Sequence, residues 1–91
     1  MGSTSIMIRV RPPDLDTWLA VHHANKELRR EYGISDGPLY RDANDPDVAL
    51  VHWNVEDVDR ALQWFSSDAF KAALVRAGMP ERELWIAEKW G

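Results

Sequence analysis

The chain has 91 residues, 45% of them apolar and 29% charged, which is typical of a single small globular domain. Its net charge of −4 at pH 7 disfavours nucleic acid as a partner, and the absence of cysteine excludes disulfides, thiolate catalysis and cysteine-based metal sites. Because no apolar run approaches the roughly 20 residues that span a bilayer and no signal peptide is visible, we expect no membrane partner and a cytoplasmic location.

The first predicted element is a strand over residues 6–11, where Ile6, Ile8 and Val10 alternate with longer or charged side chains. Two prolines follow and end the strand, because proline cannot donate to a sheet ladder. The polar residues 1–5 are expected to be a disordered N-terminus or a tag remnant. A single domain over residues 6–91 is therefore predicted.

A helix is predicted from about residue 15 to residue 32, with Asp14 as N-cap and Gly33 just past the end. At 100° per residue, one face of this helix gathers the side chains expected to pack on the sheet. They are Trp18, Val21, Asn25, Leu28 and Tyr32, with Leu15 and His22 at the flank. The charged run over residues 26–31 is interpreted as a solvated helix face.

The second half of the chain contains three further predicted strands and a second predicted helix. Residues 34–41 contain a strand, the turn formers of residues 42–47 follow, and residues 48–55 form a nearly continuous apolar strand. A second helix opens at residues 56–59, is interrupted at residues 66–68, where a new N-cap can form, and resumes over residues 69–77. The face of its first part that is expected to pack on the sheet holds Val58, Ala61, Leu62 and Phe65. Gly78 ends this helix, and a last strand is expected over residues 82–90.

The predicted order is β-α-β-β-α-β, which is the ferredoxin-like arrangement: a four-stranded antiparallel sheet with two helices on one face. The other face of the sheet needs a cover. Nothing else in a chain of this size is left to provide it, so a second copy is expected there, giving a homodimer.

Several segments resemble short proteins of the antibiotic-biosynthesis-monooxygenase-like superfamily, especially small actinobacterial members labelled as cyclases or hypothetical proteins. The segments are Asp16-x-Trp18-x-x-Val21, Leu28-Arg29-Arg30-Glu31-x-Gly33, Arg41-Asp42-Ala43-Asn44-Asp45-Pro46 and Phe65-x-Ser67-x-x-Phe70-x-x-Ala73-x-x-x-Ala77-Gly78. The resemblance covers most of the chain.

This resemblance implies a dimeric α+β barrel with one ligand pocket per subunit between sheet and helices. Members of the superfamily include cofactor-independent oxygenases of phenolic polyketides, haem-degrading enzymes and cyclases. The haem degraders combine an Asn, a Trp and a His, and the first strand here has no Asn, which speaks against that activity. Small members carry a His in the first helix; that position here is Asn25, with His22 one turn earlier.

Five tryptophans in so short a chain either fill a small core or line a pocket or subunit interface. His22 and Asn25 are spaced for one helix face, so His22 is a candidate general base and Asn25 a candidate to orient a substrate oxygen. The alternative is a hydrogen-bonded core Asn beside a rim His. Tyr40 is a candidate proton donor and Arg41 a candidate anion clamp, with an edge aromatic and a solvated charge as their alternatives.

His52 and Trp53 point to opposite faces of their strand, and the sequence leaves open which one meets the helices. A metal site that includes His22 and His52 is disfavoured because the three histidines lack ligand-type spacing. No metal and no cofactor are therefore expected. The candidate substrate-binding residues are Trp18, Arg41, His52, Trp53, Trp64 and Trp85.

Together these features predict a homodimer that binds a small aromatic or polyketide-like metabolite. An enzyme that needs no cofactor, acting as an oxygenase, cyclase or isomerase, is the preferred hypothesis. A ligand-binding or accessory protein of the same fold, without catalysis, is the alternative.

Overall fold

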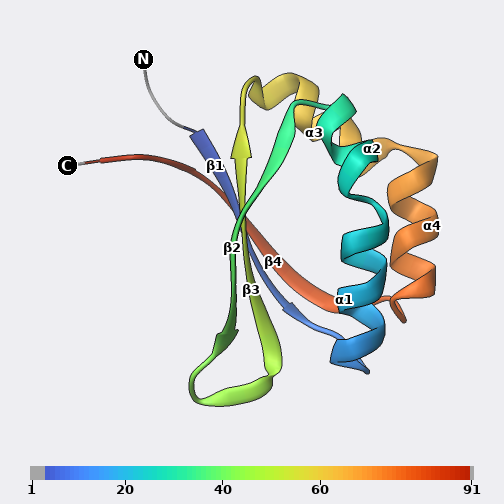
Figure 1. Ribbon diagram of the computed structural model, residues 1–91. Coiled ribbons are helices and arrows are strands. Elements are labelled where there is room, and N and C mark those ends of the chain that lie inside the picture. The colour runs from blue at the N-terminus through green and yellow to red at the C-terminus, as the bar shows by residue number, and fades with distance from the viewer. Residues whose placement is uncertain (1–3, 91) are drawn as a thin grey trace.

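A computed structural model describes residues 4–90, and its elements follow the predicted order. Figure 1 shows the sheet on one side and the helices on the other. The elements are β1 (Thr4–Arg11), α1 (Leu15–Ala24), α2 (Lys26–Glu31), β2 (Ile34–Asp42), β3 (Asp45–Val55), α3 (Val58–Ser66), α4 (Asp68–Arg76) and β4 (Glu81–Glu88). The predicted disorder or tag remnant of residues 1–5 falls partly on residues 1–3, outside the described residues; Thr4 and Ser5 already belong to β1.

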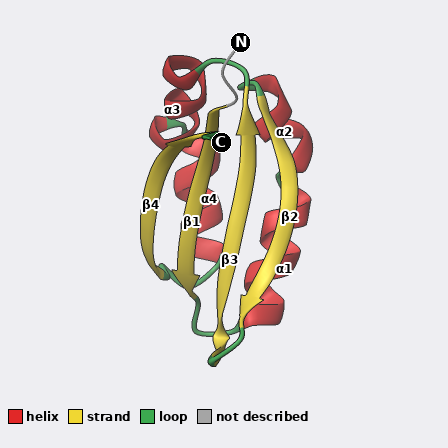
Figure 2. Ribbon diagram, turned by 90° about the vertical axis from the view of Figure 1, so that its left-hand side faces the viewer, coloured by secondary structure: helices red, strands yellow, loops and turns green. Residues whose placement is uncertain are grey.

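The four strands form one antiparallel sheet in the order β2-β3-β1-β4. All four helices lie behind this sheet when it is viewed face-on (Figure 2). The predicted ferredoxin-like α+β fold is therefore confirmed. Within residues 4–90, no element covers the second face of the sheet, which we call the open face.

Strand alternation decides which side chains meet the helices. Ile6, Ile8 and Val10 of β1 are buried, and in the β1–β3 register Ile6 pairs with Trp53 and Ile8 with Val51. Residues paired across a sheet share a face, so Trp53 looks toward the helices. The intervening residues of both strands, including His52, lie on the open face, which answers the question that the sequence left open.

The second predicted helix breaks where its sequence indicates. Ser67 ends α3 and caps α4, because its hydroxyl accepts a hydrogen bond from the backbone N–H of Phe70 at 3.1 Å. The buried face differs in one residue from expectation: Trp64 is almost fully buried whereas Leu62 is exposed. Gly78, at φ 84°, ends this helical segment as predicted.

The first helix is not continuous as predicted but divides at Asn25 into α1 and α2. The backbone N–H of Asn25 bonds to the carbonyls of His22 and His23, and its side-chain Nδ2 donates to the carbonyl of Val21 at 2.8 Å. An Asn side chain that bonds to nearby backbone competes with regular helix geometry. The break lets the chain turn along the sheet while keeping one face toward it.

A bulge in β2 sets the facing of its second half. The β2–β3 register shifts between Asp36 and Leu39, so that Gly37 and Pro38 lie opposite His52. A Cβ on Gly37 would lie 2.8 Å from the backbone carbonyl of His52, so the close approach requires glycine. Asp36, before the bulge, pairs with Trp53 and faces the helices, whereas Tyr40, after the bulge, pairs with Leu50 and faces away from them.

Strand β4 ends at Glu88, two residues earlier than predicted, so Trp90 lies beyond the sheet and is 97% exposed. Trp85 pairs with Met7 and therefore lies on the open face. The five tryptophans thus divide between the two sides: Trp18, Trp53 and Trp64 pack among the helices, whereas Trp85 and Trp90 do not.

Candidate functional site

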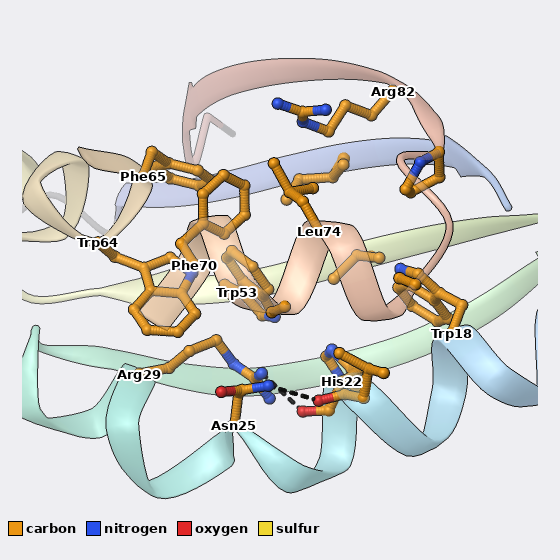
Figure 3. Close-up of a pocket in the computed structure, with 16 residues that line it drawn as sticks. Trp18, His22, Asn25, Arg29, Trp53, Trp64, Phe65, Phe70, Leu74 and Arg82 are labelled. Atoms are coloured by element: carbon orange, nitrogen blue, oxygen red, sulfur yellow. Dashed lines mark hydrogen bonds between the residues drawn. The ribbon is translucent and has the colours of Figure 1, made fainter. Parts of the chain in front are cut away.

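A cavity of about 70 Å³ lies between the helices and the helix-facing side of the sheet. Its wall is mostly apolar, with a few polar groups contributed by α1, α2 and β4. Figure 3 shows the side chains that surround it. A concave, mainly apolar site with a few convergent polar groups is the usual form of a small-molecule pocket.

The imidazole of His22 lies between two indole rings. Its centroid is 5.1 Å from that of Trp18, with an interplanar angle of 14°, and 6.2 Å from that of Trp53, with an angle of 4°. Trp18 lies one helical turn before His22 on α1, and Trp53 reaches the ring from β3. Since His22 is only 9% exposed, its ring is held by aromatic faces instead of water.

A buried ion pair lies beside this histidine. Arg29 of α2 is 2% exposed, and its Nη2 donates to both carboxylate oxygens of Asp36 at 3.0 and 3.1 Å. Its Nη1 donates to the backbone carbonyl of His22 at 2.7 Å, and its Cζ lies 5.2 Å from the centroid of Trp53. One guanidinium therefore connects both helices of the broken segment to β2 and β3.

The prediction that residues 26–31 form a solvated face is wrong for Arg29. The predicted inward residue Leu28 is 39% exposed, while Arg29 takes the inward position. Its spacing from His22 and Asn25 keeps Arg29 on the inward face, and its hydrogen bonds with Asp36 pair the charge that is buried there.

Electrostatics keep His22 neutral. Burial, followed by the nearby charge of Arg29, lowers the pKa of His22 from 6.5 to about 4. Asp36 opposes this change, since its Oδ2 lies 4.0 Å from His22 Nε2, and the charge of His23 adds slightly to the lowering. Burial also lowers the pKa of Arg29, while the hydrogen bonds and charge of Asp36 act in the opposite direction.

Three buried side-chain nitrogen donors have no hydrogen-bond partner within residues 4–90. They are Nε of Arg29, Nε1 of Trp53 and Nε1 of Trp64. Leaving a buried donor unpaired costs about 1–3 kcal/mol. All three belong to side chains that line the cavity.

The structure brings five of the candidate residues to this cavity: Trp18, His22, Asn25, Trp53 and Trp64. It places Tyr40, His52 and Trp85 together at a recess on the open face. His52 there shares a hydrogen bond of 2.9 Å with the hydroxyl of Ser5. Arg41 lines a separate recess beside Leu15 and Leu19. Tyr40 and Arg41 therefore do not join His22 within this chain.

Sequence reasoning missed Arg29, Asp36 and Arg82, all of which contribute polar atoms at or near the cavity. A signal for Arg29 was present. Positions 18, 22, 25 and 29 follow a spacing of four, three and four residues, which is the repeat of one helix face. Asp36 had a weaker signal, namely its position two residues after the apolar Ile34 on the same strand face.

In residues 4–90, no group of three His, Cys, Asp or Glu side chains is arranged to hold a metal ion. Over the same range, no helix is long and apolar enough to cross a membrane.

Comparison with known proteins relates the chain to others by fold. No protein-family model and no curated protein matches the sequence. Among solved structures, a putative antibiotic biosynthesis monooxygenase from Bordetella bronchiseptica superposes with a TM-score of 0.76 at 14% identity, covering 100% of this chain and 98% of that one. A protein of the same description from Caulobacter crescentus gives 0.69 at 21% identity, covering 94% and 90%. Another from Nitrosomonas europaea gives 0.67 at 15% identity, covering 97% and 99%. At the level of fold, the resemblance to this superfamily is confirmed.

The neutral His22 predicts how stability depends on pH. Since its pKa is about 4 in the folded protein against an ordinary 6.5, the unfolded chain binds more protons between these values. The contribution of His22 to the free energy of unfolding is therefore complete above pH 6.5. It falls by about 3 kcal/mol as the pH drops to 4. Urea unfolding at a series of pH values measures this slope.

The matched variants are His22→Gln, which should flatten the slope, and His23→Gln, which removes an exposed neighbouring histidine and should keep it. Asp45, whose pKa is lowered by its hydrogen bond and charge interaction with Arg11, titrates below 3.8 and lies outside this window. An unchanged slope in His22→Gln would contradict the assignment.

Proposed function

We propose that this chain, which shares the fold of antibiotic biosynthesis monooxygenases, binds a small aromatic molecule in the cavity and removes a proton from it without a cofactor. The observation that carries this proposal is the neutral imidazole of His22, held between two indoles at a cavity whose buried N–H donors lack partners. The reaction class is one that begins with an enolate or phenolate, such as oxygenation, cyclisation or isomerisation.

His22 suits the role of proton acceptor because it is uncharged at neutral pH. In the reaction, a C–H or O–H bond of the substrate breaks, the proton passes to the imidazole and the electron pair remains on the substrate as an oxyanion. A pKa of about 4 means that the empty site does not take this proton from solvent. The new negative charge of the substrate raises the basicity of His22 at the moment of transfer.

The surrounding groups support both charges that this step creates. The imidazolium has the Asp36 carboxylate 4.0 Å from Nε2 and the π faces of two tryptophans beside it. Three side chains that line the cavity carry N–H donors without a partner among the described residues, and we assign these donors to the oxyanion. Asn25 lines the same cavity and remains a candidate to orient the substrate.

We also propose that the protein is a homodimer through the open face. That face presents partly exposed apolar side chains, including Met7, Tyr40 and Trp85, over three strands. An apolar surface of this kind on a sheet without a helical cover is typical of a subunit interface. In such a dimer, Tyr40, His52 and Trp85 contribute to assembly.

A binding protein without catalysis is the second candidate, and the buried Arg29–Asp36 pair favours it in one respect. The guanidinium is held by hydrogen bonds to both carboxylate oxygens of Asp36 and to one backbone carbonyl. Such a rigid group suits recognition of a ligand as well as catalysis. An enzyme needs His22 for turnover, whereas a binding protein needs it only to shape the cavity.

Proton exchange distinguishes them. Acetophenone carries a ring, a carbonyl oxygen and α-protons that exchange slowly with D2O by themselves. We expect the protein to accelerate this exchange, measured by NMR, and His22→Gln to reduce the acceleration by about 100-fold, the usual contribution of a general base. His23→Gln is the control. Binding of acetophenone without any acceleration would instead support the second candidate.

The dimer is tested by analytical ultracentrifugation. Trp85→Glu places a charge on the open face at a 49% exposed position, so the subunit itself should fold normally. We expect the wild type to sediment as a dimer and Trp85→Glu as a monomer. Glu88→Lys, an exposed change at the end of the same strand, should leave the dimer intact. A monomeric wild type would overturn this part of the proposal.

A further inference from the structure

The polar groups of the cavity wall are unbalanced. The three buried side-chain atoms that lack partners within residues 4–90 are all N–H donors, and none is an acceptor. They belong to Arg29, Trp53 and Trp64, whose side chains are each at least 95% buried. A hydrocarbon or an ammonium group would leave these donors unpaired, whereas a carbonyl, phenol or phenolate oxygen would accept from them.

Arg82 provides a second polar group at the other side of the cavity. Its guanidinium lies 5.6 Å from the ring centroid of Phe70, and it forms no ion pair with any described residue. β4, which carries Arg82, and β2, which carries Asp36, are the two edge strands of the sheet. Figure 3 accordingly shows Arg82 across the cavity from Arg29 and His22.

The two cationic groups differ in what they can still bind. The charge of Arg29 is already neutralised by Asp36, so its remaining Nε–H serves as a hydrogen-bond donor to a neutral or weakly acidic oxygen. Arg82 is exposed and has no carboxylate partner among the described residues. Its planar guanidinium can therefore donate two parallel hydrogen bonds to an anion.

Cavity volume limits the size of the ligand. The volume of about 70 Å³ is roughly half of the 150 Å³ that accommodates a benzene ring in an engineered apolar cavity. A single ring therefore extends beyond this volume, and the exposed side chain of Arg82 marks the side on which it can do so. A ligand with several fused rings requires separation of the helices from the sheet.

We infer that the ligand is a single-ring aromatic carboxylate whose hydroxyl or carbonyl oxygen, opposite the carboxylate, binds the buried donors while the carboxylate binds Arg82. This inference rests on the proposed function in one respect, that the cavity is the substrate site. It makes Arg82 a specificity-determining residue.

Isothermal titration calorimetry at pH 7 tests it with four probes: 4-hydroxybenzoate, benzoate, phenol and 4-hydroxybenzamide. Benzoate lacks the inner oxygen, phenol lacks the carboxylate, and the amide replaces the carboxylate with a neutral group of similar shape. We expect 4-hydroxybenzoate to bind at least about tenfold more tightly than each of the others, because each lost charged or buried hydrogen bond costs about that factor.

The variant pair is Arg82→Gln and Arg9→Gln. Both remove one positive charge, but Arg9 lies on the open face and does not line the cavity. We expect Arg82→Gln to weaken the binding of 4-hydroxybenzoate about tenfold and that of phenol less than about twofold. Arg9→Gln should change neither affinity. Equal effects of the two variants, or equal affinities for 4-hydroxybenzoate and its amide, would overturn the inference.

The two proposals fail separately. If acetophenone exchange depends on His22 while none of the four probes follows the expected order, the substrate class is wrong and the proposed function stands. If the probes follow the expected order while no exchange occurs, the ligand class holds and the protein is a binder.

Discussion

The buried ion pair between Arg29 and Asp36 is the constraint on which the rest of the site depends. An unpaired guanidinium at 2% exposure would be severely destabilising, so the inward facing of Arg29 on α2 requires the inward facing of Asp36 on β2. The same guanidinium packs on Trp53 and bonds the His22 carbonyl. The pair thereby fixes the indole and the imidazole that form the floor of the cavity.

This arrangement separates two tasks on two faces of one sheet. On the helix side, burial and the charge of Arg29 keep His22 neutral at a cavity lined by Trp18, Trp53 and Trp64. On the open face, Tyr40, His52 and Trp85 lie together at an apolar surface. The bulge at residues 37–38 is what assigns Tyr40 to that surface, because it reverses the facing of the following residues.

Local rules predicted the fold well because its elements obey them. Alternation in β1, the caps at Asp14 and Ser67, and Gly33 and Gly78 at helix ends all appear as expected. The site was predicted only in part. His22, Asn25 and Trp18 follow from helix facing, whereas the strand pattern left the facing of Trp53 open. Arg29 and Asp36 lie on faces that their spacing allows, but nothing in the sequence indicates that these two charges pair. Charged residues are usually solvated, and only the tertiary pairing of these two reverses that expectation.

A double-mutant cycle on Arg29→Gln and Asp36→Asn tests this account most directly, with the free energy of unfolding measured in urea. Each single change leaves one charge without its partner, whereas the double variant leaves a neutral pair. The account predicts that the double variant loses less stability than the sum of the single losses, with a coupling of at least about 1 kcal/mol. Additive losses, within about 0.5 kcal/mol, would show that the pair does not organise the site and would contradict the account.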